Sequence, residues 1–320
     1  MRVVVGLLAA GVVAVCAAAA AGAPYDGPPP SDGYFGLVAA GQWNALPSGA
    51  SCAGQVHRSS WEPRPDNTRR NHVVVDPQAV HAAFAARPLG GYDAHWESWL
   101  LPRVDGQFTG TTDEIFQWAA CKWGVPDNVI RAVAYTESTW YQLLVYPSYH
   151  QRCVSYYGCG DFFTSPSSAS TVFCNALARL GSYDYQQDYG AGLCPQTFSI
   201  LGIKSWQAPS WGQMPDNQNG TFPFDRNSTA FAADFYGASL RGCFEGWVDW
   251  LGNGYAPGDL WGCVGHWYSG DWYDSGAQNY IAETQGYLNN HVWLQPDFPN
   301  DRPGCNRTYG CVGPDSLPEG

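Results

Sequence analysis

The sequence predicts a mainly α-helical fold with long loops that disulfide bonds tie together. Three observations lead to this prediction: apolar side chains recur at helical spacing in several segments, alternating strand patterns are scarce, and the chain contains 11 cysteines. Apolar residues at intervals of three and four mark the buried face of a helix. Stretches rich in proline and glycine separate these segments, so we expect one helical core with irregular connections.

The first residues have the features of a secretory signal peptide. Arg2 precedes an apolar, alanine-rich run from Val3 to about Ala20, and small residues follow up to Ala23. A positive charge, an apolar run and a small-residue cleavage site are the three parts of such a leader. We predict that residues 1–23 are removed and that the protein is secreted, with no stable membrane insertion afterwards. An uncleaved membrane anchor is the alternative, because the run approaches the length that spans a bilayer.

Removal of the leader would take Cys16 with it and leave an even set of ten cysteines. An even set in an exported chain indicates disulfide bonds, whose pairing the sequence alone does not fix. Neither Cys-x-x-Cys nor His-Glu-x-x-His spacing occurs, so we expect no metal site, and no cofactor is indicated. The ten are Cys52, Cys121, Cys153, Cys159, Cys174, Cys194, Cys243, Cys263, Cys305 and Cys311.

The charge and the aromatic content narrow the class of partner. The formal net charge is −12, which argues against nucleic-acid binding because that requires a basic surface. Aromatic residues make up 15% of the chain, with 15 Trp and 19 Tyr. These two side chains offer a flat apolar face beside a polar group, which suits the faces of sugar rings. We therefore expect a carbohydrate polymer as the partner; the alternative is that the rings fill the core.

Residues 24–105 are predicted to form an irregular N-terminal segment that packs onto the domain that follows. Residues 24–50 are rich in Pro, Gly and small polar residues and show no periodicity. One helix is expected here, from Pro77 to about Ala86, because Pro is favoured in the first turn of a helix. We assign residues 106–295 to the main domain and residues 296–320, which are again rich in Pro, Asn and Gly, to a C-terminal tail.

Four helices are predicted within residues 106–295. The first should begin after Thr111, which forms a capping-box pattern with Glu114, and should end at Gly124, a residue that tolerates the left-handed conformation. Residues 141–197 are expected to be mainly loop, because Pro and Gly recur there together with a Ser/Thr-rich run. The other helices are expected at 126–138, from 228 to about 251, and from about 277 to 288.

Glu137 is the strongest candidate for a catalytic residue. The helix at 126–138 has an apolar stripe that includes Val133 and Ala134, and Glu137 follows on the same face. A carboxyl group at the edge of a core has a raised pKa, because burial disfavours its charged form. A general acid that works near neutral pH requires such a carboxyl. The alternative interpretation is a helix that ends at a solvated glutamate.

The stretch around Glu137 resembles the opening motif of the lysozyme-like lytic transglycosylases, in the superfamily that also holds the goose-type lysozymes. The turn Gly124-Val125-Pro126 leads into a helix that ends at Glu137-Ser138. In that family the helix ends at Glu-Ser, and the glutamate is the only catalytic acid and base. The resemblance covers roughly residues 110–293 and implies a lysozyme-like catalytic domain in a secreted bacterial protein that acts at the cell wall.

Later stretches resemble the same family and imply further site residues. Residues 197–203 are similar to a Ser-x-Gly-Leu-Met-Gln-Ile segment that lines the glycan cleft, although Gly202 replaces the glutamine and Ser199 the glycine. Residues 267–270 stand in place of Tyr-Asn-Ala-Gly, and residues 280–287 resemble the closing helix. The interval from Glu137 to this segment is longer than in the family, which marks 141–197 as an insertion. The implied substrate-binding residues are Ser138, Ser199, Ile200, Leu201, Trp267, Tyr268 and Tyr280.

The resemblance implies cleavage of the β-1,4 bond between N-acetylmuramic acid and N-acetylglucosamine in peptidoglycan, or in a related N-acetylated glycan. Glu137 would protonate the leaving oxygen and then deprotonate the muramyl 6-hydroxyl, which gives 1,6-anhydromuramyl ends. We expect a monomer that needs no cofactor. Two alternatives stay open: a muramidase or chitinase-like hydrolase, which needs a second carboxylate, and a non-catalytic glycan-binding protein. The candidate second carboxylates are Asp161, Asp184, Asp188 and Asp225, with Asp161 the first to test.

Overall fold

The computed structural model describes residues 26–143, 161–163, 168–180, 185, 193–211, 214–252 and 254–301. Within these ranges the protein is mainly helical and contains three disulfide bonds, as the sequence predicts. No helix in the described ranges has the length and apolar character needed to cross a bilayer. The predicted leader lies outside the described residues, as do Cys153, Cys159, Cys305 and Cys311.

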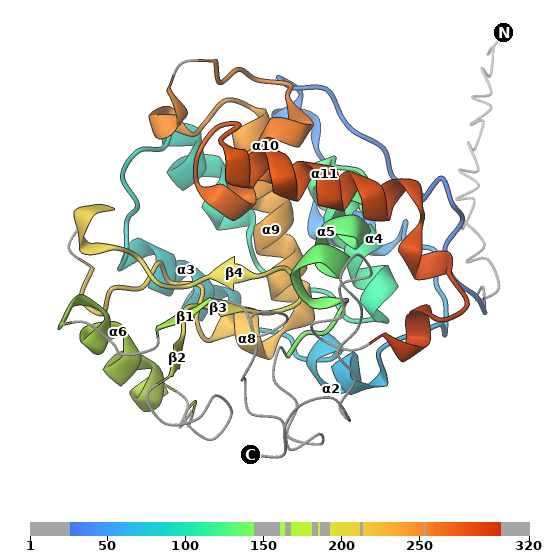
Figure 1. Ribbon diagram of the computed structural model, residues 1–320, viewed down its shortest axis with the longest axis horizontal. Coiled ribbons are helices and arrows are strands. Elements are labelled where there is room, and N and C mark those ends of the chain that lie inside the picture. The colour runs from blue at the N-terminus through green and yellow to red at the C-terminus, as the bar shows by residue number, and fades with distance from the viewer. Residues whose placement is uncertain are drawn as a thin grey trace, which may run out of the picture.

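Five helices form the centre of the fold. Figure 1 shows α9 through the middle of the molecule, with α4 and α5 beside it and α10 and α11 across one end. Their apolar faces meet in one continuous core, which also takes in residues of the N-terminal segment. The five helices are α4 (Thr112–Trp123), α5 (Asp127–Ser138), α9 (Thr229–Phe244), α10 (Leu260–Ser269) and α11 (Ser275–Asn289).

Local sequence signals account for the bounds of α4 and α5. Thr111 and Glu114 form the predicted capping box at the start of α4, and Gly124 ends that helix in the left-handed conformation. A side chain at Gly124 would also collide with Val38 of the N-terminal segment, since a Cβ there would lie 2.9 Å from the Cβ of Val38. Pro126 is the N-cap of α5, so the chain turns directly from one helix into the next.

The later helices differ in part from the prediction. Helix α9 begins after Ser228, whose hydroxyl accepts a hydrogen bond from the backbone of Phe231, but it ends at Phe244 rather than near Leu251. The reason is Gly246, whose φ of +92° does not continue a right-handed helix. Helix α11 agrees with the prediction to within two residues. Helix α10 was not predicted, because its sequence has no clear polar face.

Two small antiparallel sheets lie beside the helices, together with a helix that the prediction missed. Strand β1 (Phe162–Phe163) pairs with β2 (Cys194–Pro195), and β3 (Thr197–Phe198) pairs with β4 (Ile203–Lys204). Helix α6 (Ser168–Arg179) lies in the region predicted to be loop, and this part of the prediction is wrong. The helix forms because its buried residues pack with β2 and β3 in a second, smaller core, which the Cys174–Cys194 disulfide closes.

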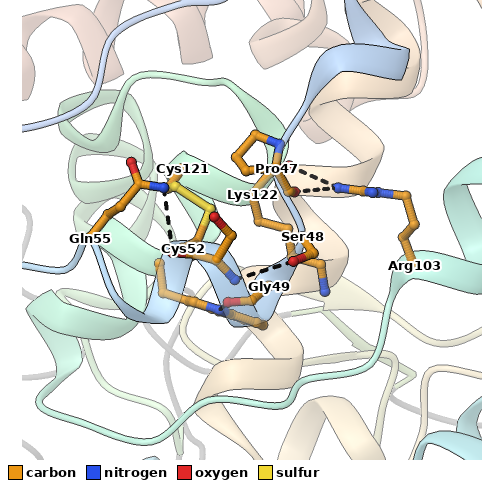
Figure 2. Close-up of a disulfide and its surroundings, with 10 residues drawn as sticks. Pro47, Ser48, Gly49, Cys52, Gln55, Arg103, Cys121 and Lys122 are labelled. Carbon is orange, nitrogen blue, oxygen red and sulfur yellow. Dashed lines mark hydrogen bonds between the residues drawn. A yellow bond between two sulfur atoms is a disulfide. The ribbon is translucent and has the colours of Figure 1, made fainter. Parts of the chain in front are cut away.

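The N-terminal segment carries the remaining helices and is tied to α4. Its helices are α1 (Gly49–Ala53), α2 (Thr68–Asn71) and α3 (Pro77–Ala85). Figure 2 shows the Cys52–Cys121 disulfide between α1 and α4, and nearby Arg103 donates hydrogen bonds to the carbonyls of Pro47 and Lys122. The third disulfide, Cys243–Cys263, joins α9 to α10. A four-residue helix, α8 (Phe224–Asn227), directly precedes α9.

Candidate active site

Glu137 lies in the last turn of α5, half-buried where this helix faces α11 and the β3–β4 turn. Burial raises the pKa of its carboxyl to about 8, and the negative charges of Asp161 and Glu283 act in the same direction. A hydrogen bond from Tyr280 opposes this shift but does not cancel it. The carboxyl is therefore mostly protonated at pH 7. The structure thus shows the raised pKa that the apolar stripe of α5 led us to expect.

Tyr280 of α11 holds the carboxyl of Glu137, and Tyr268 of α10 stacks on Tyr280. The hydroxyl of Tyr280 donates a hydrogen bond to Oε1 of Glu137. Tyr280 is buried, and its ring stacks on that of Tyr268, with centroids 4.8 Å apart and planes 8° apart. Tyr268 is 60% exposed, so it presents its outer face to solvent beside the acid. Tyr280 therefore positions the acid, and Tyr268 offers a surface on which a sugar ring can stack.

The other carboxylate oxygen of Glu137 faces Gly202. This glycine has a φ of +62°, and a Cβ on it would lie 2.7 Å from the carboxyl carbon of Glu137 and closer still to Oε2. No hydrogen bond from the described residues holds Oε2. Only glycine leaves room for the carboxyl at this position. Oε2 is therefore the oxygen that remains available to a substrate.

The turn that contains Gly202 is fixed to the end of α5 by side-chain hydrogen bonds to the backbone. Ser138 is 1% exposed, and its hydroxyl hydrogen-bonds to the carbonyls of Ala134 and Ile200. The backbone N–H of Ile200 donates to the side chain of Gln142. Ser199 has a φ of +77° and a buried hydroxyl. Ser138 thus holds the turn against the acid, and its side chain does not reach a substrate.

The prediction that Ile200 and Leu201 form a cleft wall is wrong for their side chains, which are fully buried in the core. The turn brings their backbone, not their side chains, to the site. The carbonyl of Leu201 accepts a hydrogen bond of 3.0 Å from Nε1 of Trp267. Trp267 is half-buried and meets the ring of Tyr236 edge-on, with centroids 4.9 Å apart. Trp267 therefore joins α10 to the turn and leaves part of its ring accessible.

A cavity of about 210 Å³ opens beside the acid; we refer to it as the side cavity. Gly202, Tyr236 and Trp267 line it, and all three also lie against Glu137 or its neighbours. The negative charge of Glu137 raises the pKa of Tyr236, in addition to the larger effect of burial. The side cavity and the surroundings of the carboxyl therefore share Gly202 and Tyr236.

Aromatic rings form much of the far wall of the side cavity. They are Tyr92 and Trp96 from the N-terminal segment and Trp250 from the turn after α9. Trp211, which is 45% exposed, meets Trp250 edge-on with centroids 5.0 Å apart. Surfaces of this kind suit the apolar faces of pyranose rings. The sequence analysis did not single out these residues, because Trp and Tyr are frequent throughout the chain and no local pattern distinguishes those that line a cavity.

The candidate second carboxylates have different surroundings. Asp161 is exposed, its backbone N–H donates a 2.7 Å hydrogen bond to the hydroxyl of Thr197, and its charge acts on Glu137. Asp225 is fully buried and hydrogen-bonds to Ser205, and burial raises its pKa to about 6, so its role is structural. Asp184 and Asp188 lie outside the described residues.

Glu283 is a carboxylate near the acid that the sequence analysis missed. It lies one turn after Tyr280 on α11 and accepts a 2.9 Å hydrogen bond from Tyr287. The helical spacing between Tyr280 and Glu283 is the signal that could have identified it. In the described ranges no group of acidic, His and Cys side chains is arranged to hold a metal ion.

Replacing Tyr280 by phenylalanine should raise the pKa of Glu137 above about 8, because the lost hydrogen bond stabilises the ionised form. Carbon-13 NMR titration of the glutamate carboxyl groups measures this pKa directly. Tyr287→Phe is the matched control, since it removes a tyrosine–carboxylate hydrogen bond from the same helix that goes to Glu283 and not to Glu137. An unchanged or lower pKa in Tyr280→Phe would show that the hydroxyl does not bind the carboxylate in solution.

The site thus brings together one protonated carboxyl with a free oxygen, a positioning tyrosine and aromatic surfaces on two sides. Such an arrangement can donate a proton to a leaving oxygen and afterwards accept one. Comparisons of the chain with models of protein families, with curated proteins and with solved structures find no match. The function is therefore inferred from the geometry of the site and from the sequence.

Proposed function

We propose that the protein is a secreted lytic transglycosylase of lysozyme-like fold that cleaves the β-1,4 bond between N-acetylmuramic acid and N-acetylglucosamine in peptidoglycan. One observation carries the proposal: Glu137 is kept protonated near neutral pH and is held by Tyr280, while Oε2 lies against Gly202, which lines an aromatic-rich cavity. A general acid with these properties is what glycoside cleavage requires. The resemblance of residues 110–293 to the lytic transglycosylases points to the same chemistry.

In the proposed reaction Glu137 acts twice. Oε2 first donates its proton to the glycosidic oxygen, and the bond from the anomeric carbon to that oxygen breaks. The resulting carboxylate then takes the proton from the 6-hydroxyl of the same muramyl residue, whose oxygen bonds to the anomeric carbon. The products are a free 4-hydroxyl and a 1,6-anhydro ring, and no water is consumed. The protonated Glu137 is restored, so one carboxyl is sufficient.

Secretion and action at the cell wall are part of the proposal. Three disulfide bonds among the described residues are compatible with an oxidising compartment. The predicted leader would direct export. With a net charge of −12, the protein would hold its glycan by shape and by stacking on aromatic rings rather than by general attraction to an acidic wall.

A hydrolase is the second candidate function, and the position of Asp161 favours it. The charge of this residue, which directly precedes β1, acts on Glu137, so a second carboxylate lies near the acid. Hydrolases use such a group either as a nucleophile or to activate water. The product would then be a reducing end instead of an anhydro ring.

Asp161→Asn distinguishes the two functions. In a transglycosylase, we expect the rate to fall less than about tenfold, because the change only lowers the pKa of Glu137. In a hydrolase, the rate should fall by about 10² to 10⁴, since a catalytic carboxylate is lost. Initial rates on purified peptidoglycan measure the effect, and the exposed Asp66→Asn serves as the control.

The product ends test the proposed function itself. The oxidised protein without its leader is incubated with purified peptidoglycan, and the soluble fragments are identified by mass spectrometry. Anhydromuramyl ends support the transglycosylase, and reducing ends support the hydrolase. If no fragments form while the protein still binds the glycan, the chain is a glycan-binding protein and the proposal is wrong.

A further inference from the structure

The chain leaves α5 through two residues in the left-handed conformation, and neither of them is glycine. Thr139 has a φ of +54° and Trp140 a φ of +68°, and they directly follow the helix that carries Glu137. Both residues are buried, and a branched or bulky side chain makes this conformation unfavourable. Such a backbone persists only where surrounding contacts hold it, and it is frequent at functional sites. The contacts that hold this pair therefore also fix the end of α5.

Two side chains of the N-terminal segment hold the left-handed pair. Nε of Arg64 donates a 2.8 Å hydrogen bond to the carbonyl of Thr139, and Nδ2 of Asn67 donates one of 2.7 Å to the carbonyl of Trp140. Arg64 and Asn67 are fully buried. The side-chain carbonyl of Asn67 also accepts a 2.8 Å hydrogen bond from the backbone N–H of Gln142. Asn67 therefore binds the backbone at two points just beyond α5.

Gln142 connects this part of the chain to the turn that lies against the acid. Its Oε1 accepts a 3.3 Å hydrogen bond from the backbone N–H of Ile200, and its Nε2 donates one of 2.6 Å to the carbonyl of Asp225. The side chain is 1% exposed, so solvent does not compete for these partners. Ile200 belongs to the same turn as Gly202, against which Oε2 of Glu137 lies. Hydrogen bonds through Gln142 therefore link the N-terminal segment to the turn beside the acid.

We propose that Asn67 and Gln142 are positioning residues for catalysis, because they fix the two parts of the chain that place the carboxyl of Glu137. One part is the end of α5, which carries the acid, and the other is the turn that contains Gly202. Asn67 lies before the stretch that resembles the lytic transglycosylases, so the resemblance assigns it no part in the site. The N-terminal segment thus takes part in forming the site. This inference rests on the proposed function, since it takes Glu137 as the acid.

The test uses Asn67→Ala and Gln142→Met, the second of which roughly keeps the volume of the side chain. Each should lower kcat on purified peptidoglycan by about 10- to 100-fold, because a displacement of about 1 Å in a catalytic group has an effect of that size. KM should change little, since both side chains are buried and do not reach the substrate. The double variant should lose about as much as the worse single variant, because both residues act through the same hydrogen bonds.

A second measurement is the pH dependence, which a loss of stability alone does not move. Burial is the largest cause of the raised pKa of Glu137, so a turn that moves away should lower this pKa towards its ordinary value of 4.5. Less of the acid is then protonated at a given pH, and the rate of both variants should begin to fall at a lower pH than that of the wild type. Carbon-13 NMR titration measures the same pKa without substrate. Neither variant alters the titratable groups that interact with Glu137, which are Asp161, Tyr236, Tyr280 and Glu283.

Asn71→Ala is the matched control for the loss of a buried amide. Asn71 is 1% exposed and lies in the same segment, and its Nδ2 donates to the hydroxyl of Thr112, as that of Asn67 does. Its other hydrogen bond among the described residues goes to Glu62 and not to the backbone after α5. The thermal midpoint should fall in both asparagine variants, because each loses buried hydrogen bonds. Only Asn67→Ala should lose kcat and change the pH dependence.

The outcomes separate this inference from the proposed function. If Asn67→Ala and Gln142→Met keep the kcat and the pH dependence of the wild type, the inference is overturned and the function stands. Equal losses in Asn71→Ala overturn it as well, because they would show an effect of stability alone. If Asn67→Ala does not fold, Gln142→Met decides by the same two measurements. If the wild type does not cleave the glycan, the proposed function is wrong and the inference falls with it.

Discussion

Glu137→Gln is expected to lower the rate of glycan cleavage by about 10² to 10⁴, the range that general acid–base catalysis contributes. Glutamine has nearly the shape of protonated glutamic acid but cannot give up a proton, so the effect isolates the chemistry from the packing. The Tyr280 hydroxyl can still donate to the amide oxygen. Binding of glycan should therefore persist, and the loss should appear in kcat rather than in KM.

The pH dependence of the wild type gives an independent check on the same residue. The carboxyl must be protonated to act as an acid, and its pKa is about 8. The rate should therefore be nearly constant from pH 6 to pH 7 as far as this group is concerned, and should fall as the pH rises through about 8. A rate that keeps rising beyond pH 9, or activity retained in Glu137→Gln, would contradict the assignment of Glu137 as the acid.

Gly202→Ala is the second change for which we expect a large effect. A Cβ at this position would lie 2.7 Å from the carboxyl carbon of Glu137, so the acid must move away from its hydrogen bond with Tyr280. A displacement of about 1 Å in a catalytic group can lower a rate by about 10². The left-handed φ of +62° adds a destabilisation of about 1–2 kcal/mol for any residue with a side chain.

Gly41→Ala is the matched control for the backbone effect. Gly41 has a φ of +83°, and a Cβ there would meet no atom within 4 Å. Both variants should lower the free energy of unfolding through the left-handed backbone, as measured by chemical denaturation, with the larger loss in Gly202→Ala because of its contact with Glu137. Only Gly202→Ala should lose activity. Equal activity in the two variants would mean that the contact with Glu137 does not constrain the site.

Local patterns in the sequence were sufficient to predict some of the helices that hold the site. The capping box at Thr111 and the left-handed Gly124 bound α4 where the sequence predicts, because each depends on residues three or four positions apart. The apolar stripe of α5 placed Glu137 at the edge of the core for the same reason. By contrast, α6 was missed because its stability comes from packing against β2 and β3, which lie elsewhere in the chain.

The sequence by itself therefore determined a helical protein with a disulfide framework, a negative net charge and one glutamate at the end of a helix with an apolar stripe. Only the tertiary structure decided which cysteines pair, that Tyr280 rather than Tyr268 holds the acid, and that Gly202 makes room for it. Tyr280 lies 143 positions from Glu137 in the chain. Contacts over such distances depend on how the helices pack together, and no local pattern of residues records that arrangement.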